Sequence, residues 1–223
     1  MSFVIYGLMG LMPGDPIDLM ISADPKLTSE DATRIRELFG LDKSIFERYG
    51  NWLGAAVTGD FGYSRLFARP VLDVLFPALA NTVILIGISI GLSLLIGLPA
   101  GLIAALKPYS KLDYSINLIA FGGISMPAFW LALLLIILFA VTLGILPAGG
   151  TGELASGETW NKAHFLILPV LTLVISSVGG HTRYMRAAML ETLRQDYIHT
   201  AKAKGAGQTR IVLVHALRNA MIP

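Results

Sequence analysis

Residues 79–106 read LANTVILIGISIGLSLLIGLPAGLIAAL and contain no charged side chain. An α-helix needs roughly 20 apolar residues to cross the hydrocarbon core of a bilayer, so this stretch is long enough to be a membrane helix. Gly87 and Gly91 are four residues apart, as are Gly97 and Gly101, which places each pair on one face of that helix. Small residues at this spacing let membrane helices approach closely, and we expect these glycines to be helix-packing positions.

The composition of the whole chain also indicates a membrane protein. Of its 223 residues, 54% are hydrophobic and 14% are charged, and the mean hydropathy is +0.67. An average soluble domain carries about 25% charged residues. We therefore predict an all-α, polytopic membrane protein. The predicted spans are about residues 79–106, 114–143 and 165–182, with Pro127 expected to kink the second of them.

The first residues predict a membrane segment followed by a polar region. The apolar run in residues 1–13 is too short to cross a bilayer. We interpret it as the outer end of a first transmembrane helix whose beginning is missing from this sequence, with a short interfacial helix as the alternative. Residues 14–73 carry many charges and are predicted to lie outside the membrane and to be partly helical.

Two helices and a turn are predicted within that polar region. Thr28 or Ser29 can cap a helix that continues to about Phe39. Ser44 and Glu47 form a capping box for a second helix that ends near Val57. The stretch GDFGYS at residues 59–64 is typical of a turn.

The distribution of Lys and Arg predicts the orientation in the membrane. The short turn at residues 107–113 and the segment 183–223 are rich in basic residues. Residues 144–164, in contrast, contain a single basic residue, Lys162. By the positive-inside rule, the turn and the C-terminal segment are cytoplasmic. Residues 14–73 and 144–164 then face the outside.

The sequence offers no convincing catalytic or metal-binding motif. It contains no cysteine, which excludes a disulfide scaffold and a thiolate nucleophile. Phosphate-loop, zinc-protease and nucleophile-elbow motifs are also absent. Its histidines are scattered rather than spaced as ligands: His164, His181, His199 and His215. We therefore expect no catalytic residue, no metal site and no bound cofactor in this chain.

Two other classes of function remain as rivals at this point. A membrane enzyme acting at the inner interface would have to use Ser177, His181 and Arg183, and no spacing of nucleophile and base supports that set. An ATP-independent channel or secondary transporter would need ionisable or carbonyl-lined groups within the membrane. The centres of the three predicted spans contain no ionisable side chain.

The segment 183–223 has the clearest pattern outside the spans. Its sequence predicts a helix that ends at Gly205 and a second helix over about residues 208–219. A helix with small residues on one face and basic residues on the other is typical of a docking surface for a soluble partner. A helix-turn-helix for DNA is disfavoured because the segment is tethered to a membrane span. A basic helix lying on anionic lipid headgroups is the remaining alternative.

Several motifs in the chain resemble those of one transporter family. DYIHTAKAKG at residues 196–205 and HALRNAMIP at residues 215–223 are similar to the cytoplasmic coupling loop of permease subunits of ATP-binding-cassette importers, in the oligopeptide, dipeptide and nickel group. Further similarities, in the family's order, are PGDP at 13–16, GDFGYS at 59–64, SMPAFW at 125–130 and LGILP at 143–147. The general Glu-Ala-Ala triplet of such loops is replaced here by His199, Thr200 and Ala201.

This resemblance implies a fold and a transport mechanism. Residues 79–223 would form the transmembrane domain of a type I importer in the cell's inner (plasma) membrane, and the family's usual helix number implies a chain truncated at both ends. The implied partners are a second permease subunit, two cytoplasmic ATPases that bind ATP and Mg, and an extracytoplasmic solute-binding protein, with no nucleic acid.

The subunit would form the path for peptides or similar small solutes, while oligopeptide, dipeptide, nickel and glutathione remain open as cargo. The implied ATPase-coupling residues are His199, Thr200, Ala201, Lys202, Gly205 and Arg210.

Overall fold

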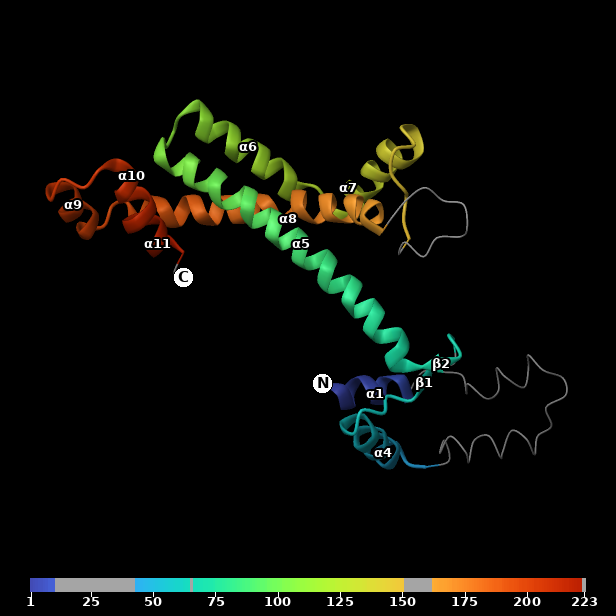
Figure 1. The fold of residues 1–223 in the computed structure, drawn as a ribbon. Helices are drawn as coiled ribbons and strands as arrows, with labels where there is room; N and C mark the ends of the chain where they lie inside the picture. The colour runs from blue at the N-terminus through green and yellow to red at the C-terminus, as the bar shows by residue number, and fades with distance from the viewer. Residues whose placement is uncertain (11–42, 65, 151–161, 222–223) are drawn as a thin grey trace, which may run out of the picture. The chain divides into compact units, whose positions relative to one another are not determined.

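A computed structural model describes residues 1–10, 43–64, 66–150 and 162–221 of the chain. The chain divides into two compact units, Met1–Pro77 and Ala78–Pro223. Helix α5 (Val71–Leu106) begins in the first unit and continues into the second. Most of the described residues are helical and only two short strands occur among them, which confirms the predicted all-α class (Figure 1).

The first unit pairs two short helices through aromatic side chains. Helix α1 (Ser2–Gly10) contacts α4 (Ile45–Val57), and the rings of Tyr6 and Tyr49 lie 5.5 Å apart at an angle of 65°. The Ser44 hydroxyl accepts a hydrogen bond from the Glu47 amide at 3.3 Å, so the predicted cap and the predicted end near Val57 are confirmed. The helix predicted up to Phe39 lies outside the described residues.

A small hairpin connects this unit to the long apolar helix. Strands β1 (Tyr63–Ser64) and β2 (Arg69–Pro70) pair antiparallel. Gly59 and Gly62 have φ values of +92° and +80°, a left-handed conformation that glycine adopts easily. They confirm the first part of the turn predicted at residues 59–64, whereas its last two residues form β1.

Within the described residues, two helices are long and apolar enough to cross a membrane, α5 and the segment Ala163–Thr192 of helix α8 (Lys162–Thr192). Helix α5 begins at Val71, earlier than the predicted 79. Pro77 is the seventh residue of this helix, and its missing N–H leaves the Asp73 carbonyl without its helical donor. Helix α8 continues past the predicted end at 182, because the sequence after Gly180 contains no proline or glycine before Thr192.

The predicted span 114–143 consists of separate helices. Helix α6 (Lys111–Ser125) and the segment formed by α7 (Ala128–Leu135) with the π-helix η1 (Ile136–Thr142) meet at 96°. Met126 between them is extended, with φ −90° and ψ 128°, as a residue before proline prefers. Pro127 therefore marks a break that is sharper than the predicted kink, and the pair can form either a broken span or a re-entrant loop.

Helices α5, α6 and α8 form the core of the second unit. Figure 1 shows α6 lying beside α8, with α5 crossing α8. A methyl group built on Gly101 would lie 2.4 Å from the Thr182 carbonyl oxygen, and one on Gly97 would lie 2.9 Å from the His181 Cβ. The absence of side chains at these two positions is what allows α5 to reach α8.

The C-terminal helices pack at one end of α8 (Figure 1). They are α9 (Asp196–Ala203), α10 (Gln208–Arg210), the π-helix η2 (Ile211–Ala216) and α11 (Leu217–Ala220). Together they are called the C-terminal knob here. The second helix predicted at 208–219 corresponds to the continuous run from α10 to α11, and its central turns are π-helical.

Candidate functional site

A buried ion pair joins α6 to α8 at the end of the unit that bears the knob. Arg186 donates from Nε to Asp113 Oδ1 and from Nη2 to Oδ2, both at 2.6 Å. The Asp113 side chain is 3% exposed and that of Arg186 is 23% exposed. A two-pronged arginine–carboxylate contact fixes both distance and orientation, so it holds the two helices in one register.

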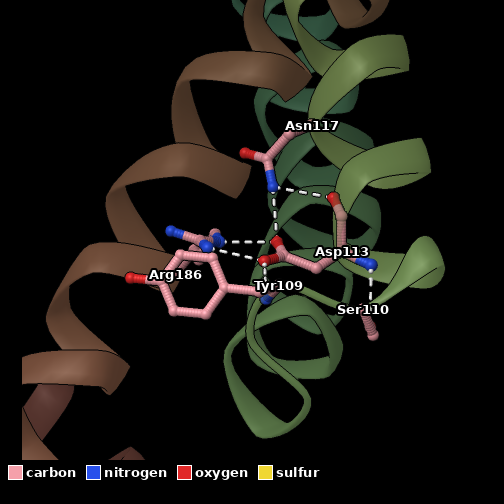
Figure 2. Close-up of polar contacts among 5 residues, drawn as sticks. All are labelled: Tyr109, Ser110, Asp113, Asn117 and Arg186. Atoms are coloured by element: carbon pink, nitrogen blue, oxygen red, sulfur yellow. Dashed lines mark hydrogen bonds and ion pairs between the residues drawn. The ribbon is translucent and has the colours of Figure 1, made fainter.

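Local sequence explains why Asp113 stands in this position. Ser110 caps α6, and its hydroxyl accepts a hydrogen bond from the Asp113 amide at 3.2 Å. The Asp113 carboxylate accepts further hydrogen bonds from the Tyr109 amide at 2.9 Å and from Asn117 Nδ2 at 2.6 Å. Figure 2 shows these groups arranged around the carboxylate. Its oxygens are thus supplied with donors from both helices, which offsets the cost of burying the charge.

The C-terminal knob is anchored to α8 by apolar side chains. Met185 and Met189 of α8 pack with Ile198 and Ile211 of the knob, and all four are at most 2% exposed. The end of α5 contributes Ala105 to the same cluster. Because the cluster joins three parts of the fold, the knob must move together with the end of α8.

Gly205 ends α9 in the manner that the sequence predicts. Its φ is +81°, its amide donates to the Lys202 carbonyl at 2.9 Å, and the Ala206 amide donates to the Ala201 carbonyl at 3.1 Å. These two bonds form the motif in which a left-handed glycine closes a helix. The turn directs the chain into α10 at a fixed angle.

An open groove of about 380 Å³ lies on the knob at this turn. Of the six residues predicted to couple to an ATPase, the groove brings together Thr200, Ala201, Gly205 and Arg210. His199 and Lys202 are exposed on α9 but do not line the groove. Its full lining is Tyr197, Thr200, Ala201, Lys204, Gly205, Ala206, Arg210 and His215.

The serine and histidine considered for an interfacial enzyme belong to a packing network. Ser93 of α5 shares a hydrogen bond of 2.9 Å with His181 Nδ1, and Ser177 donates to Ser93 at 3.2 Å. Ser93 is 0% exposed, so these hydrogen bonds lie within the packed contact between α5 and α8. Among the described residues, no group of three His, Asp or Glu side chains could hold a metal ion.

The glycines at the other part of α5 have different surroundings. In the described parts of the chain, nothing lies within 4 Å of a methyl group built on Gly87 or Gly91. Their spacing is the same as that of Gly97 and Gly101, yet the described residues place no helix against them.

Comparison with known proteins identifies the family. A family model described as "Binding-protein-dependent transport system inner membrane component" matches residues 97–223, which include the ion pair and the knob. The chain belongs to this family. The match fits the importer hypothesis and not the ATP-independent alternative.

Several curated relatives of this permease match along its whole length. The oligopeptide transport system permease protein AppB of Bacillus subtilis (strain 168) is 41% identical over 225 residues, covering 100% of this chain and 70% of AppB. The dipeptide transport system permease protein DppB of Alkalihalophilus pseudofirmus is 35% identical, covering 100% of this chain and 72% of DppB. The glutathione transport system permease protein GsiC of Escherichia coli (strain K12) is 37% identical, covering 100% and 69%.

Sequence reasoning identified the knob but missed the ion pair. Asp113 was visible as the single acidic residue in the turn between two spans, and Arg186 as a base just beyond the next apolar run. Ionisable groups at the ends of membrane helices are commonly paired, which is the signal that could have linked them.

Proposed function

We propose that the C-terminal knob is the coupling element through which a cytoplasmic ATPase drives this permease. The observation that carries the proposal is the exposed groove around Thr200, Ala201, Gly205 and Arg210, on a knob that a buried apolar cluster anchors to α8. To transmit force, a docked partner needs an accessible groove on an element that is itself firmly packed against the membrane helix. Lys204 and Arg210 add positive charge for an acidic partner.

In this proposal α8 acts as the lever between the ATPase and the membrane path. The helix is continuous from its apolar part to the residues that anchor the knob. The Asp113–Arg186 pair makes α6 follow the same movement. ATP and Mg are bound by the partner ATPases, and their closure would switch the permease between inward-open and outward-open states. The chain itself contributes no covalent chemistry.

The proposed cargo is a peptide or a peptide-like solute. Relatives are named for transport of oligopeptides, dipeptides and glutathione, which share the peptide bond and free carboxylates. A solute-binding protein would deliver this cargo from outside, and a second permease subunit would complete the path. The proposed orientation puts the knob and the 107–113 turn in the cytoplasm. Mass spectrometry of ligand that co-purifies with the binding protein would identify the cargo.

Ala201→Asp tests the coupling role directly. It places a larger, negatively charged side chain among the basic residues Lys204 and Arg210 that are proposed to attract an acidic partner. Like charges that face each other across an interface cost several kcal/mol. We expect co-purification of the ATPase with the assembled transporter to fall by about a hundredfold or more. Ala203→Asp is the matched control, because Ala203 is exposed on the same helix and does not line the groove.

Gly205→Val tests the turn rather than the groove surface. A branched side chain is strained at a φ of +81°, so the second half of the knob would be misdirected. Gly207→Val is the control, since Gly207 has a φ of −64° and open space around it. Wild-type ATPase binding and wild-type transport-linked ATP hydrolysis in both Ala201→Asp and Gly205→Val would refute the proposed coupling role.

A further inference from the structure

A second pocket lies beside the buried ion pair, between α6 and α8. It has a volume of about 500 Å³ and does not include any residue of the knob. Its lining consists of Asn117, Gly180, Arg183, Tyr184, Arg186 and Ala187. Arg183 comes three residues after Gly180, the last residue of the apolar run 165–180. The pocket therefore opens where α8 leaves the hydrocarbon core and reaches the depth of the lipid headgroups.

The pocket carries a net positive charge. Arg186 is neutralised by Asp113, whereas Arg183 is exposed and has no ion-pair partner within residues 1–10, 43–64, 66–150 and 162–221. A guanidinium is a strong ligand for phosphate and carboxylate groups. An anionic group in this pocket would supply the counter-charge that the described part of the chain does not.

Hydrogen-bonding capacity in the pocket is also incompletely used. Arg186 donates to Asp113 from Nε and Nη2, and its Nη1 has no acceptor among the described residues. Asn117 donates from Nδ2 to both the carboxylate and the carbonyl of Asp113, and no described residue donates to its amide oxygen. Figure 2 shows this oxygen and the third guanidinium nitrogen directed away from the Asp113 carboxylate. The pocket thus offers donors for an anion and an acceptor for a hydroxyl.

Apolar side chains lie next to the pocket on α6. Tyr114 and Leu118 are 64% and 72% exposed, and Leu118 follows Asn117 directly. Tyr184 is 56% exposed and lines the pocket itself. Tyrosine at this depth is typical of the boundary between headgroups and hydrocarbon. A ligand that fits must therefore combine an anionic, hydroxyl-bearing head with an apolar body.

We propose that this pocket binds the headgroup of an anionic phospholipid of the inner leaflet, with the phosphate between Arg183 and Arg186 and a headgroup hydroxyl at Asn117. Bound there, the lipid bridges α6 and α8 next to the ion pair that holds them together. The inference depends on the proposed orientation of the chain but not on the identity of the cargo or on ATPase docking.

The test uses the complete transporter, purified in detergent and stripped of lipid. Short-chain phosphatidylglycerol, phosphatidylcholine with the same chains, and inorganic phosphate are titrated separately while the Tm is followed. We expect phosphatidylglycerol to raise the Tm most strongly. Arg183→Gln should weaken its apparent affinity by about fivefold, the effect of one basic residue near an anionic lipid surface. Arg183→Lys should retain most of the affinity.

Arg194→Gln is the matched control, because Arg194 is exposed, carries the same charge and does not line the pocket. Wild-type affinity in Arg194→Gln together with loss in Arg183→Gln supports the lipid site. Equal effects of the two variants would show general attraction to negative charge and would overturn it. Equal stabilisation by inorganic phosphate or by phosphatidylcholine would overturn it as well. ATPase co-purification in Arg183→Gln, which is expected to be unchanged, separates this result from failure of the coupling proposal.

Discussion

Two parts of helix α5 carry the same glycine spacing but differ in what surrounds them. Gly97 and Gly101 touch α8 so closely that a methyl group on either would meet backbone or Cβ atoms within 3.0 Å. Gly87 and Gly91 have open space around them in the described structure. The spacing of small residues therefore predicts a helix face without bulky side chains. Whether another part of the same chain packs against that face depends on the tertiary fold.

The closely packed part coincides with the polar contacts of the unit. Ser93 and His181 are hydrogen-bonded one turn from Gly97, and Asp113 and Arg186 form their ion pair where α6 and α8 meet. The apolar cluster of the knob includes Ala105, four residues after Gly101. Close packing, hydrogen bonds and an ion pair thus hold α5, α6 and α8 together at the end of the unit that bears the knob.

The largest effect is expected from breaking the ion pair. Asp113→Asn leaves Arg186 largely buried without its counter-charge, and we expect a loss of about 3 kcal/mol in the free energy of unfolding. Unfolding in detergent with increasing denaturant measures this loss. Adding Arg186→Gln to Asp113→Asn should restore part of it, because the unpaired charge is then gone. A stability of Asp113→Asn equal to wild type would show that the pair does not hold α6 to α8.

A smaller effect is expected from adding one methyl group to the packed glycine face. Gly101→Ala forces a Cβ toward the Thr182 carbonyl oxygen, which would lie 2.4 Å away, and such overpacking typically costs about 1–3 kcal/mol. Gly91→Ala is the matched control, and within the isolated chain it should change the free energy of unfolding by less than about 0.5 kcal/mol. Equal losses for the two variants would contradict the difference between the two parts of α5.

The smallest effect is expected from the hydrogen bond between Ser93 and His181. Ser93→Ala removes it and should cost about 1 kcal/mol. Ser89→Ala is the control, because the Ser89 hydroxyl donates to the Leu85 carbonyl within its own helix and bonds to no other helix among the described residues. Equal losses in the free energy of unfolding for Ser89→Ala and Ser93→Ala would show that the hydrogen bond between α5 and α8 adds no stability beyond that of a bond within one helix.

Local sequence signals predicted much of the fold. The cap at Ser44, the glycine that ends α9, and the apolar runs of α5 and α8 depend on neighbours along the chain, and the structure has all of them. Helix ends were less accurate, since α5 begins at Val71 and not near residue 79, and α8 continues to Thr192 and does not end near residue 182. The 96° break at Pro127 was larger than expected, since proline predicts an interruption but not its angle.

Features of the site that depend on contacts between distant residues could not be predicted from local sequence. The pairing of Asp113 with Arg186 joins positions far apart in the chain, and nothing in their local sequence specifies it. The groove brings Thr200 and Ala201 together with Arg210 only because Gly205 turns the chain back. The pattern of small and basic residues nevertheless located the segment that forms the groove.

Cross-linking from a single cysteine tests the central claim, that the knob docks a cytoplasmic ATPase, most directly. The given sequence contains no cysteine, so Thr200→Cys and Thr58→Cys each provide a single exposed thiol in this subunit of the assembled transporter. A short thiol-to-amine cross-linker is added to inverted membrane vesicles, and the products are identified by mass spectrometry. The account predicts that Thr200→Cys is joined to the ATPase and Thr58→Cys is not. Absence of an ATPase cross-link from Thr200→Cys, or equal cross-linking from Thr58→Cys, would contradict it.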